Sequence, residues 1–130
     1  MRFLFDASAI INLIRKGDLR VLSEGCTLDL ALYESLNALW KEHSLLKRMS
    51  RDLVAEYVDI LLGIFEAIEV RTIAGLERRV LENAIRYDLT VYDSSYFTYA
   101  IENGLAMVTD DVKLAKRVKG SIEVLSTSDL

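Results

Sequence analysis

The stretch Phe3-Leu4-Phe5-Asp6-Ala7-Ser8 runs from three apolar residues into an acid and a hydroxyl. Three consecutive apolar residues are typical of a short strand that is buried on both faces. The next residues, 9–16, have the apolar spacing of a helix, which Ser8 can cap at its start and Gly17 can end. A buried strand that leads directly into a helix predicts the first unit of a parallel sheet.

The same alternation of strand and helix continues along the rest of the chain. The expected strands lie at 26–28, 68–70, 106–108 and 122–125, with a brief extended segment at 90–92. The expected helices lie at about 30–43, 50–66, 76–85, 96–101 and 111–119. This alternation predicts an α/β fold, namely a single domain, 1–130, with three α/β/α layers around a central, mostly parallel sheet.

The composition excludes several kinds of active site. The chain has 130 residues, a formal net charge of -4, one histidine (His43) and one cysteine (Cys26). One cysteine cannot form an intrachain disulfide, and these two residues are too few for a Cys/His zinc site. A metal bound here must therefore be held by oxygen, which favours hard cations such as Mg²⁺ or Mn²⁺.

Charged residues interrupt every apolar segment. The longest stretches without a charged residue, 7–14 and 94–101, are each eight residues long. A membrane-spanning helix needs about 20 apolar residues, so we expect no membrane segment and a cytoplasmic protein.

Acidic residues occur where parallel sheets bind their ligands, beyond the carboxyl ends of the strands. Asp6 follows the first predicted strand, Asp93 the brief extended segment, and Asp110 and Asp111 the fourth strand, while Glu34 lies near the start of a helix. Each aspartate alone could simply cap a helix. Several acids at one edge of the sheet would repel one another unless a cation neutralised them, which predicts a metal site.

Four local sequence patterns surround these acids. They are Phe3-Leu4-Phe5-Asp6-Ala7-Ser8, Tyr33-Glu34-Ser35-Leu36-Asn37-Ala38-Leu39-Trp40, Leu89-Thr90-Val91-Tyr92-Asp93-Ser94-Ser95-Tyr96 and Val108-Thr109-Asp110-Asp111-Val112-Lys113-Leu114-Ala115. In this order, and in a chain of this length, the patterns resemble the PIN-domain family, specifically its VapC-type toxin nucleases. The resemblance covers essentially the whole chain, and the third pattern is the most specific.

The resemblance implies a metal-dependent ribonuclease that cleaves RNA phosphodiester bonds and leaves a 5′-phosphate and a 3′-hydroxyl. Its catalytic, metal-binding acids fall on Asp6, Glu34, Asp93 and Asp111, which would hold one or two Mg²⁺ or Mn²⁺ ions. The Thr-x-Asp register of the fourth pattern selects Asp111 over its neighbour Asp110.

Other residues are expected to support this site. Ser8 and Thr109 match family positions whose hydroxyls support the metal site, and Asn12 and Asp110 are expected to line the same cleft. The resemblance also implies a VapB-type antitoxin as partner and a homodimer. The helix at 50–66 is the expected contact surface.

A cluster of basic residues follows the fourth pattern. Lys113, Lys116 and Arg117 share one side of the last predicted helix, at spacings i, i+3 and i+4, and could contact RNA phosphates. A solvated helix face explains the same spacing, and a net charge of -4 is unlike that of a typical nucleic-acid-binding protein.

Two alternative functions compete with the nuclease. A PIN fold could serve as a scaffold that binds RNA or protein with little or no nuclease activity, although a scaffold needs no converging carboxylates. A phosphotransfer enzyme of the haloacid-dehalogenase type would need Asp-x-Asp after the first strand, where this chain has Asp6-Ala7-Ser8.

Overall fold

The computed structural model describes residues 1–130 and has a central parallel sheet of five strands. The strands are β1 (Phe3–Phe5), β2 (Gly25–Leu28), β3 (Glu69–Arg71), β4 (Ala106–Val108) and β5 (Val124–Leu125). Their order across the sheet is β3-β2-β1-β4-β5, and every neighbouring pair is parallel. The strand β1, which leads directly into Asp6, therefore lies at the centre of the sheet.

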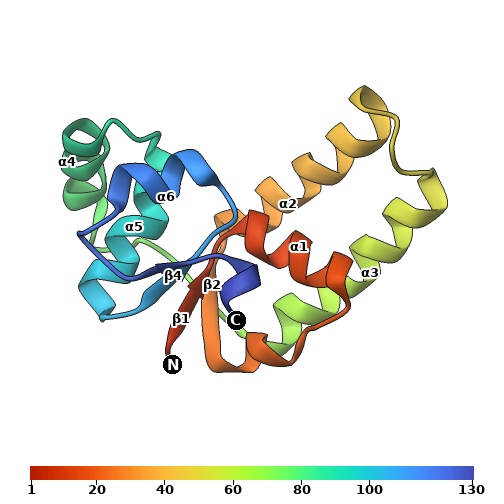
Figure 1. Ribbon diagram of the computed structural model, residues 1–130, viewed down its shortest axis with the longest axis horizontal. Helices are drawn as coiled ribbons and strands as arrows, with labels where there is room; N and C mark the ends of the chain where they lie inside the picture. The colour runs from red at the N-terminus through yellow and green to blue at the C-terminus, as the bar shows by residue number, and fades with distance from the viewer.

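Helices connect successive strands. They are α1 (Ala7–Lys16), α2 (Leu30–Trp40), α3 (Arg51–Ala67), α4 (Glu77–Tyr87), α5 (Val91–Asn103) and α6 (Val112–Val118). Three short helical turns, η1 (Arg20–Glu24), η2 (Lys41–Leu45) and η3 (Thr127–Asp129), complete the chain. Figure 1 shows α2 and α3 projecting together on one side of the sheet, with α4, α5 and α6 gathered on the other.

The burial of the strands shows that both faces of the sheet are covered. Every residue of β1, β2 and β4 is buried, whereas the edge strand β3 is exposed and β5 is partly exposed. Apolar side chains from the sheet and from the helices, among them Leu4, Ile10, Phe97 and Met107, form a common core. The expected three-layer α/β/α fold with a parallel sheet is confirmed.

Gly25 allows β1 and β2 to pair closely. It lies opposite Phe3 in the register of the two strands. A Cβ atom at this position would come within 2.3 Å of the Phe3 carbonyl oxygen and 2.7 Å of the Phe5 ring. Only glycine fits such a close backbone approach, so this residue fixes the pairing at the centre of the sheet.

The first helix begins two residues earlier than expected. Asp6, not Ser8, is its N-cap, and the Asp6 carboxylate accepts a hydrogen bond from the amide of Ala9. Ser8 lies inside the first turn and donates its hydroxyl to Asp6 instead. The prediction of a Ser8 cap is therefore wrong, whereas the predicted end at Gly17, which adopts a left-handed conformation, is confirmed.

Of the extended segment expected at 90–92, only Thr90 is extended, and Val91 and Tyr92 belong to the first turn of α5. Thr90 is the N-cap of α5, and its hydroxyl accepts a hydrogen bond from the amide of Asp93. The β-branched and aromatic residues of this segment favour a strand locally, but the cap and the apolar face that follows favour a helix. Asp93 consequently lies in the first turn of α5 and not at the end of a strand.

The remaining boundaries differ by only a few residues. Ser50 caps α3 as predicted, through a 3.1 Å hydrogen bond from the amide of Leu53. The helix expected at 30–43 changes at Lys41 into the π-helical turn η2. Among the helices there is none whose length and apolarity would allow it to cross a membrane.

Candidate active site

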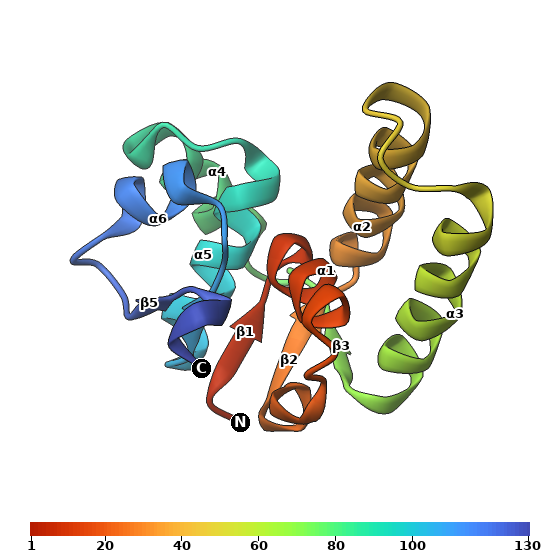
Figure 2. The same cartoon turned by 45° about the vertical axis from the view of Figure 1, so that its right-hand side comes forward.

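The acids singled out in the sequence lie at one edge of the sheet. Asp6 follows β1 directly, and Asp111 is the N-cap of α6 just beyond β4. Glu34 belongs to α2 and Asp93 to α5. Figure 2 shows α1 beginning where the arrow of β1 ends, with α5 on one side and α2 on the other. Parallel strands thus bring together residues from both halves of the chain.

Asp6 is the most buried of these acids, with a relative exposure of 5%. One of its carboxylate oxygens accepts hydrogen bonds from the Ser8 hydroxyl at 2.7 Å and the Ala9 amide at 2.9 Å. The other oxygen accepts a hydrogen bond from the Thr109 hydroxyl. Burial outweighs these donors and raises the pKa of Asp6 to about 6.

The hydroxyls of Ser8 and Thr109 join the two central strands at the site. The two hydroxyl oxygens lie 3.3 Å apart. The Ser8 hydroxyl also accepts a hydrogen bond from the amide of Asp110, and the Thr109 hydroxyl accepts one from the amide of Asp111, both at 3.0 Å. Through this network the hydroxyls hold Asp6 against the segment that follows β4. The structure thus places both residues where the sequence predicted them, in contact with an acid of the site.

Glu34 is held by a tyrosine that the sequence analysis did not single out. The Tyr96 hydroxyl donates a 2.7 Å hydrogen bond to Glu34, and Tyr96 itself is only 1% exposed. Burial, together with the charges of Asp93 and Asp6, raises the pKa of Glu34. Tyr96 follows Asp93 by three residues, so helical spacing alone could have placed both side chains on one face of α5.

Asp93 is half-buried at the start of α5. Burial raises its pKa, and the negative charge of Asp111 raises it further, while Arg117 acts in the opposite direction. Asp93 is therefore electrostatically coupled to each of the other three acids, since it also raises the pKa of Asp6 and of Glu34.

Asp110 and Asp111 point to different partners. The Asp110 carboxylate accepts hydrogen bonds from the Asn12 amide at 2.7 Å and from the amide and hydroxyl of Thr127 at 2.8 and 2.7 Å. Burial alone would raise the pKa of Asp110, but these donors hold that pKa below its usual value. Asp110 and Asn12 thus fasten the C-terminal turn η3 to α1.

Asp111 keeps one carboxylate oxygen free. Its other oxygen caps α6 by accepting the amides of Lys113 and Leu114 at 3.0 and 3.2 Å. The negative charge of Asp111 raises the pKa of Asp93, whereas both oxygens of the Asp110 carboxylate accept hydrogen bonds from Asn12 and Thr127. The surroundings therefore favour Asp111 over Asp110 as the fourth acid of the site.

The acids are neighbours, but they do not form a preassembled ligand cage. No group of three or more acidic, histidine or cysteine side chains lies close enough in this structure to surround a metal ion. Each of Asp6, Glu34 and Asp111 is instead held by a separate protein donor. None of the ion pairs in the structure includes any of the four acids. Oxygen donors without a cationic partner fit a hard divalent cation, and the raised pKa values of Asp6, Glu34 and Asp93 agree with this.

The basic residues of α6 have different surroundings. Lys113 and Lys116 are exposed, and Lys116 lines a hollow of about 490 Å³ together with Thr109 and Asp111. Arg117 donates a 2.9 Å hydrogen bond to the Asp88 carbonyl and thereby ties α6 to the end of α4. Lys116 is consequently the basic residue of this helix that lies on the hollow beside the site.

No protein-family model matches the chain. The chain is, however, 33% identical over 126 residues to exonuclease VapC9 of Pyrobaculum aerophilum, covering 95% of this chain and 91% of that protein. It is 30% identical over 125 residues to ribonuclease VapC3 of the same organism, covering 90% of this chain and 95% of that protein.

Two solved structures are similar to the chain in fold. The crystal structure of PAE2754 from Pyrobaculum aerophilum matches with a TM-score of 0.79 and 32% identity, over 98% of this chain and 92% of that one. A DNA-bound VapBC structure from Salmonella typhimurium matches with a TM-score of 0.67 and 18% identity, over 98% of both chains. At that identity the second match supports the fold alone.

Proposed function

We propose that this chain, which belongs to the VapC family of PIN-domain proteins, is a ribonuclease that hydrolyses RNA phosphodiester bonds with the help of Mg²⁺ or Mn²⁺. Asp6, Glu34, Asp93 and Asp111 would hold one or two of these ions. The observation that carries the proposal is that the carboxylates of Asp6, Glu34 and Asp93 are buried or half-buried, have raised pKa values and form no ion pair.

The protein's own contribution is to orient the carboxylates of Asp6 and Glu34 before substrate arrives. A bound divalent cation lowers the pKa of a coordinated water and so supplies hydroxide at neutral pH. Ser8 and Thr109 fix the rotamer of Asp6, and Tyr96 fixes that of Glu34. His43 is hydrogen-bonded to the Met49 carbonyl beyond α2. The proton transfers therefore fall to the carboxylates and to water, and not to an imidazole.

A cleavage assay with purified protein tests this function. We expect single-stranded RNA to be cut in the presence of Mg²⁺ or Mn²⁺, with 5′-phosphate and 3′-hydroxyl ends, and EDTA to abolish the activity. Asp93→Asn should reduce activity by at least about 100-fold, because it removes an acid coupled to the other three. Asp59→Asn, an exposed position on α3, is the matched control and should leave the rate unchanged.

The result also separates the nuclease from a scaffold. RNA binding without cleavage under either metal would assign the chain to the scaffold function, and full activity in Asp93→Asn would overturn the site. Metal binding is followed independently, as the rise in melting temperature on adding Mn²⁺, which Asp93→Asn should diminish.

We also propose a VapB-type antitoxin as protein partner and a homodimer as the assembled state. We propose that both occur in the cytoplasm, where the RNA substrate is found. Exposed apolar side chains on α2 and α3, including Leu36, Trp40 and Leu62, support a protein contact there. Light scattering should give the mass of a dimer. Coexpression with the neighbouring reading frame should yield a complex without RNA cleavage.

A further inference from the structure

A hollow of about 620 Å³ opens directly beside the candidate active site. Residues of α2, the η2 turn and the start of α5 line it, including Tyr33, Glu34, Lys41 and Tyr92. Glu34 belongs both to this hollow and to the coupled acids, so whatever occupies the hollow also reaches the carboxylates.

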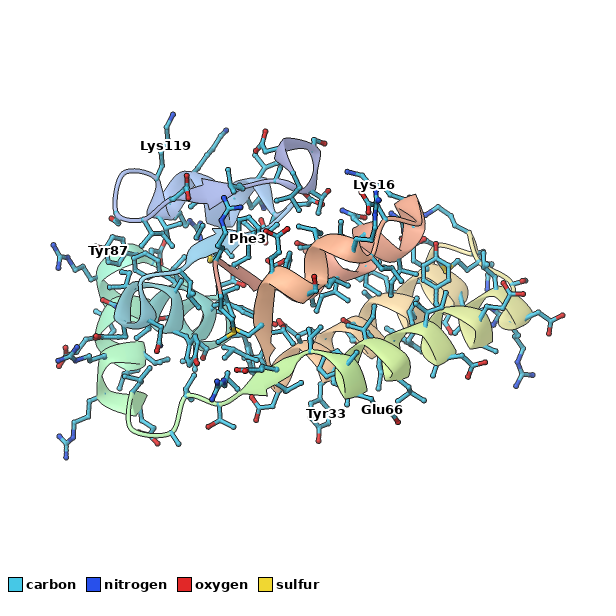
Figure 3. The ribbon with its side chains drawn as sticks, turned by 90° about the horizontal axis from the view of Figure 1, so that it is seen from below. Phe3, Lys16, Tyr33, Glu66, Tyr87 and Lys119 are labelled. Carbon is cyan, nitrogen blue, oxygen red and sulfur yellow. The ribbon has the colours of Figure 1, made fainter.

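Two tyrosines on the hollow expose their rings to solvent. Tyr33 is 76% exposed and Tyr92 is 63% exposed. The aromatic pairs of the structure are Phe3 with Phe5 and Tyr87 with Phe97, so neither exposed ring is stacked. Figure 3 shows Tyr33 pointing away from the ribbon. These rings do not stabilise the core, and their faces are free to contact a ligand.

The position of these tyrosines relative to the acids is the same in both helices. Tyr33 immediately precedes Glu34, and Tyr92 immediately precedes Asp93. Each tyrosine is therefore the sequence neighbour of an acid of the site. Both rings and the Glu34 side chain line the same hollow, so a ligand in the hollow can contact all three.

The charges on the hollow favour an anionic ligand once the acids hold a cation. Arg48 is paired with Glu42 through hydrogen bonds of 2.8 and 2.6 Å, which leaves that pair neutral. Lys41 takes part in no ion pair and is exposed. The remaining charged residue of the hollow is Glu34, which is also one of the proposed metal ligands.

We propose that this hollow is a stacking subsite for single-stranded RNA, in which bases next to the cleaved phosphate stack on Tyr33 and Tyr92 while Lys41 contacts a neighbouring phosphate. Free aromatic faces beside a cation are the means by which proteins bind single strands without a fixed sequence. Paired bases in a duplex hide their faces, so the subsite selects unpaired substrate. This inference rests on the proposed ribonuclease function and names its substrate class.

Steady-state kinetics on a labelled, mixed-sequence single-stranded RNA oligonucleotide test the subsite. Tyr33→Ala and Tyr92→Ala should each raise KM by about 10-fold with little change in kcat, because stacking contributes to binding. Tyr33→Phe and Tyr92→Phe keep the rings and should restore the wild-type KM. The same strand annealed to its complement should be cut poorly by the wild type. Ile85→Ala, at a side chain that is also 76% exposed but lies on α4, is the matched control.

The outcomes distinguish this proposal from the ribonuclease function itself. If the wild type cuts RNA while both alanine variants keep its KM, the stacking subsite is wrong and the nuclease stands. If the wild type cuts no RNA with either metal, the proposed ribonuclease function itself is contradicted. An unchanged KM with weaker binding of a protein partner would assign the hollow to that partner and overturn the subsite. Melting temperatures of all variants show whether a change reflects folding.

Discussion

At Asp6, a single carboxylate caps α1 and also carries a charge that its burial opposes. The cap stabilises the helix, but the raised pKa means that the folded protein holds the Asp6 proton more tightly than the unfolded chain does. The stability from this group is present below pH 3.8, the ordinary pKa, and is lost as the pH rises through about 6. At neutral pH the ionised residue therefore destabilises the metal-free protein.

Replacing Asp6 by asparagine should remove this pH dependence and keep the cap, because an asparagine oxygen can also accept the Ala9 amide. In EDTA, the unfolding free energy of Asp6→Asn relative to wild type should rise by about 2 kcal/mol between about pH 4 and about pH 7. Urea unfolding at several pH values measures it. Parallel stability curves for the two proteins would contradict the raised pKa.

Tyr96 acts on the site through Glu34 and is therefore a positioning residue. Tyr96→Phe keeps the ring in the core but removes the donor of the 2.7 Å hydrogen bond to Glu34. We expect Mn²⁺ affinity to fall by about 10-fold, as for other residues that orient a metal ligand. Isothermal titration without RNA measures this affinity. Tyr99→Phe, on the same helix and without a hydroxyl partner, should bind Mn²⁺ like the wild type, and an equal loss in both would contradict the role of Tyr96.

Single residues also show what a local sequence pattern can and cannot indicate. The Thr-x-Asp pattern selected Asp111, and the structure leaves Asp111 one free carboxylate oxygen, whereas Asp110 is filled by Asn12 and Thr127. The partner of Asp110 could not be foreseen, because Thr127 lies 17 residues away and no local pattern joins them. The sequence did not indicate the contact of Tyr96 with Glu34, because a buried aromatic residue on a helix usually belongs to the core.

Among the elements, α5 shows how a cap can override local strand propensity. Thr90, Val91 and Tyr92 favour a strand when read alone, yet the Thr90 hydroxyl accepts the Asp93 amide and starts a helix. The long helix α3, with its Ser50 cap and clear apolar period, was predicted almost to the residue. Strong periodicity and capping are thus readable locally, whereas the conformation of a short β-branched run depends on the residues after it.

The cap of α5 should matter for activity as well as for stability, because it fixes the turn that carries Asp93. Thr90→Ala should lower the unfolding free energy by about 1 kcal/mol and also reduce RNA cleavage measured well below the melting temperature. Ser50→Ala removes the equivalent cap of α3 and should cost similar stability. Its cleavage rate should remain that of the wild type, so equal rates in the two variants would show that the Thr90 cap does not position Asp93.

For the molecule as a whole, the sequence predicts the class of fold but not the order of the strands. Alternating strands and helices imply a parallel sheet, and the fully apolar β1 implies a central strand. Which strand lies on each side depends on where each crossover returns to the sheet. The order β3-β2-β1-β4-β5 therefore emerges only in three dimensions.

The charge distribution is also a property of the whole chain. Acidic residues exceed basic ones by four, 20 against 16, and the candidate site itself contains four acids. The remainder of the chain is therefore formally neutral. A net charge of -4 consequently does not describe the surface that RNA would meet once divalent cations occupy the site.

The strand order divides the protein into two complementary fragments. The first half of the chain supplies β1, β2 and β3, the second half supplies β4 and β5, and β1 and β4 are the only strands that pair across the division. Each half carries two of the four acids, and the turn between β3 and α4 is largely exposed. Chains 1–73 and 74–130, each inactive alone, should therefore reconstitute RNA cleavage when coexpressed, whereas a second fragment bearing Asp93→Asn should not. Reconstitution would show that the pairing of β1 with β4, and the core around it, bring the four acids together without a covalent link between the halves.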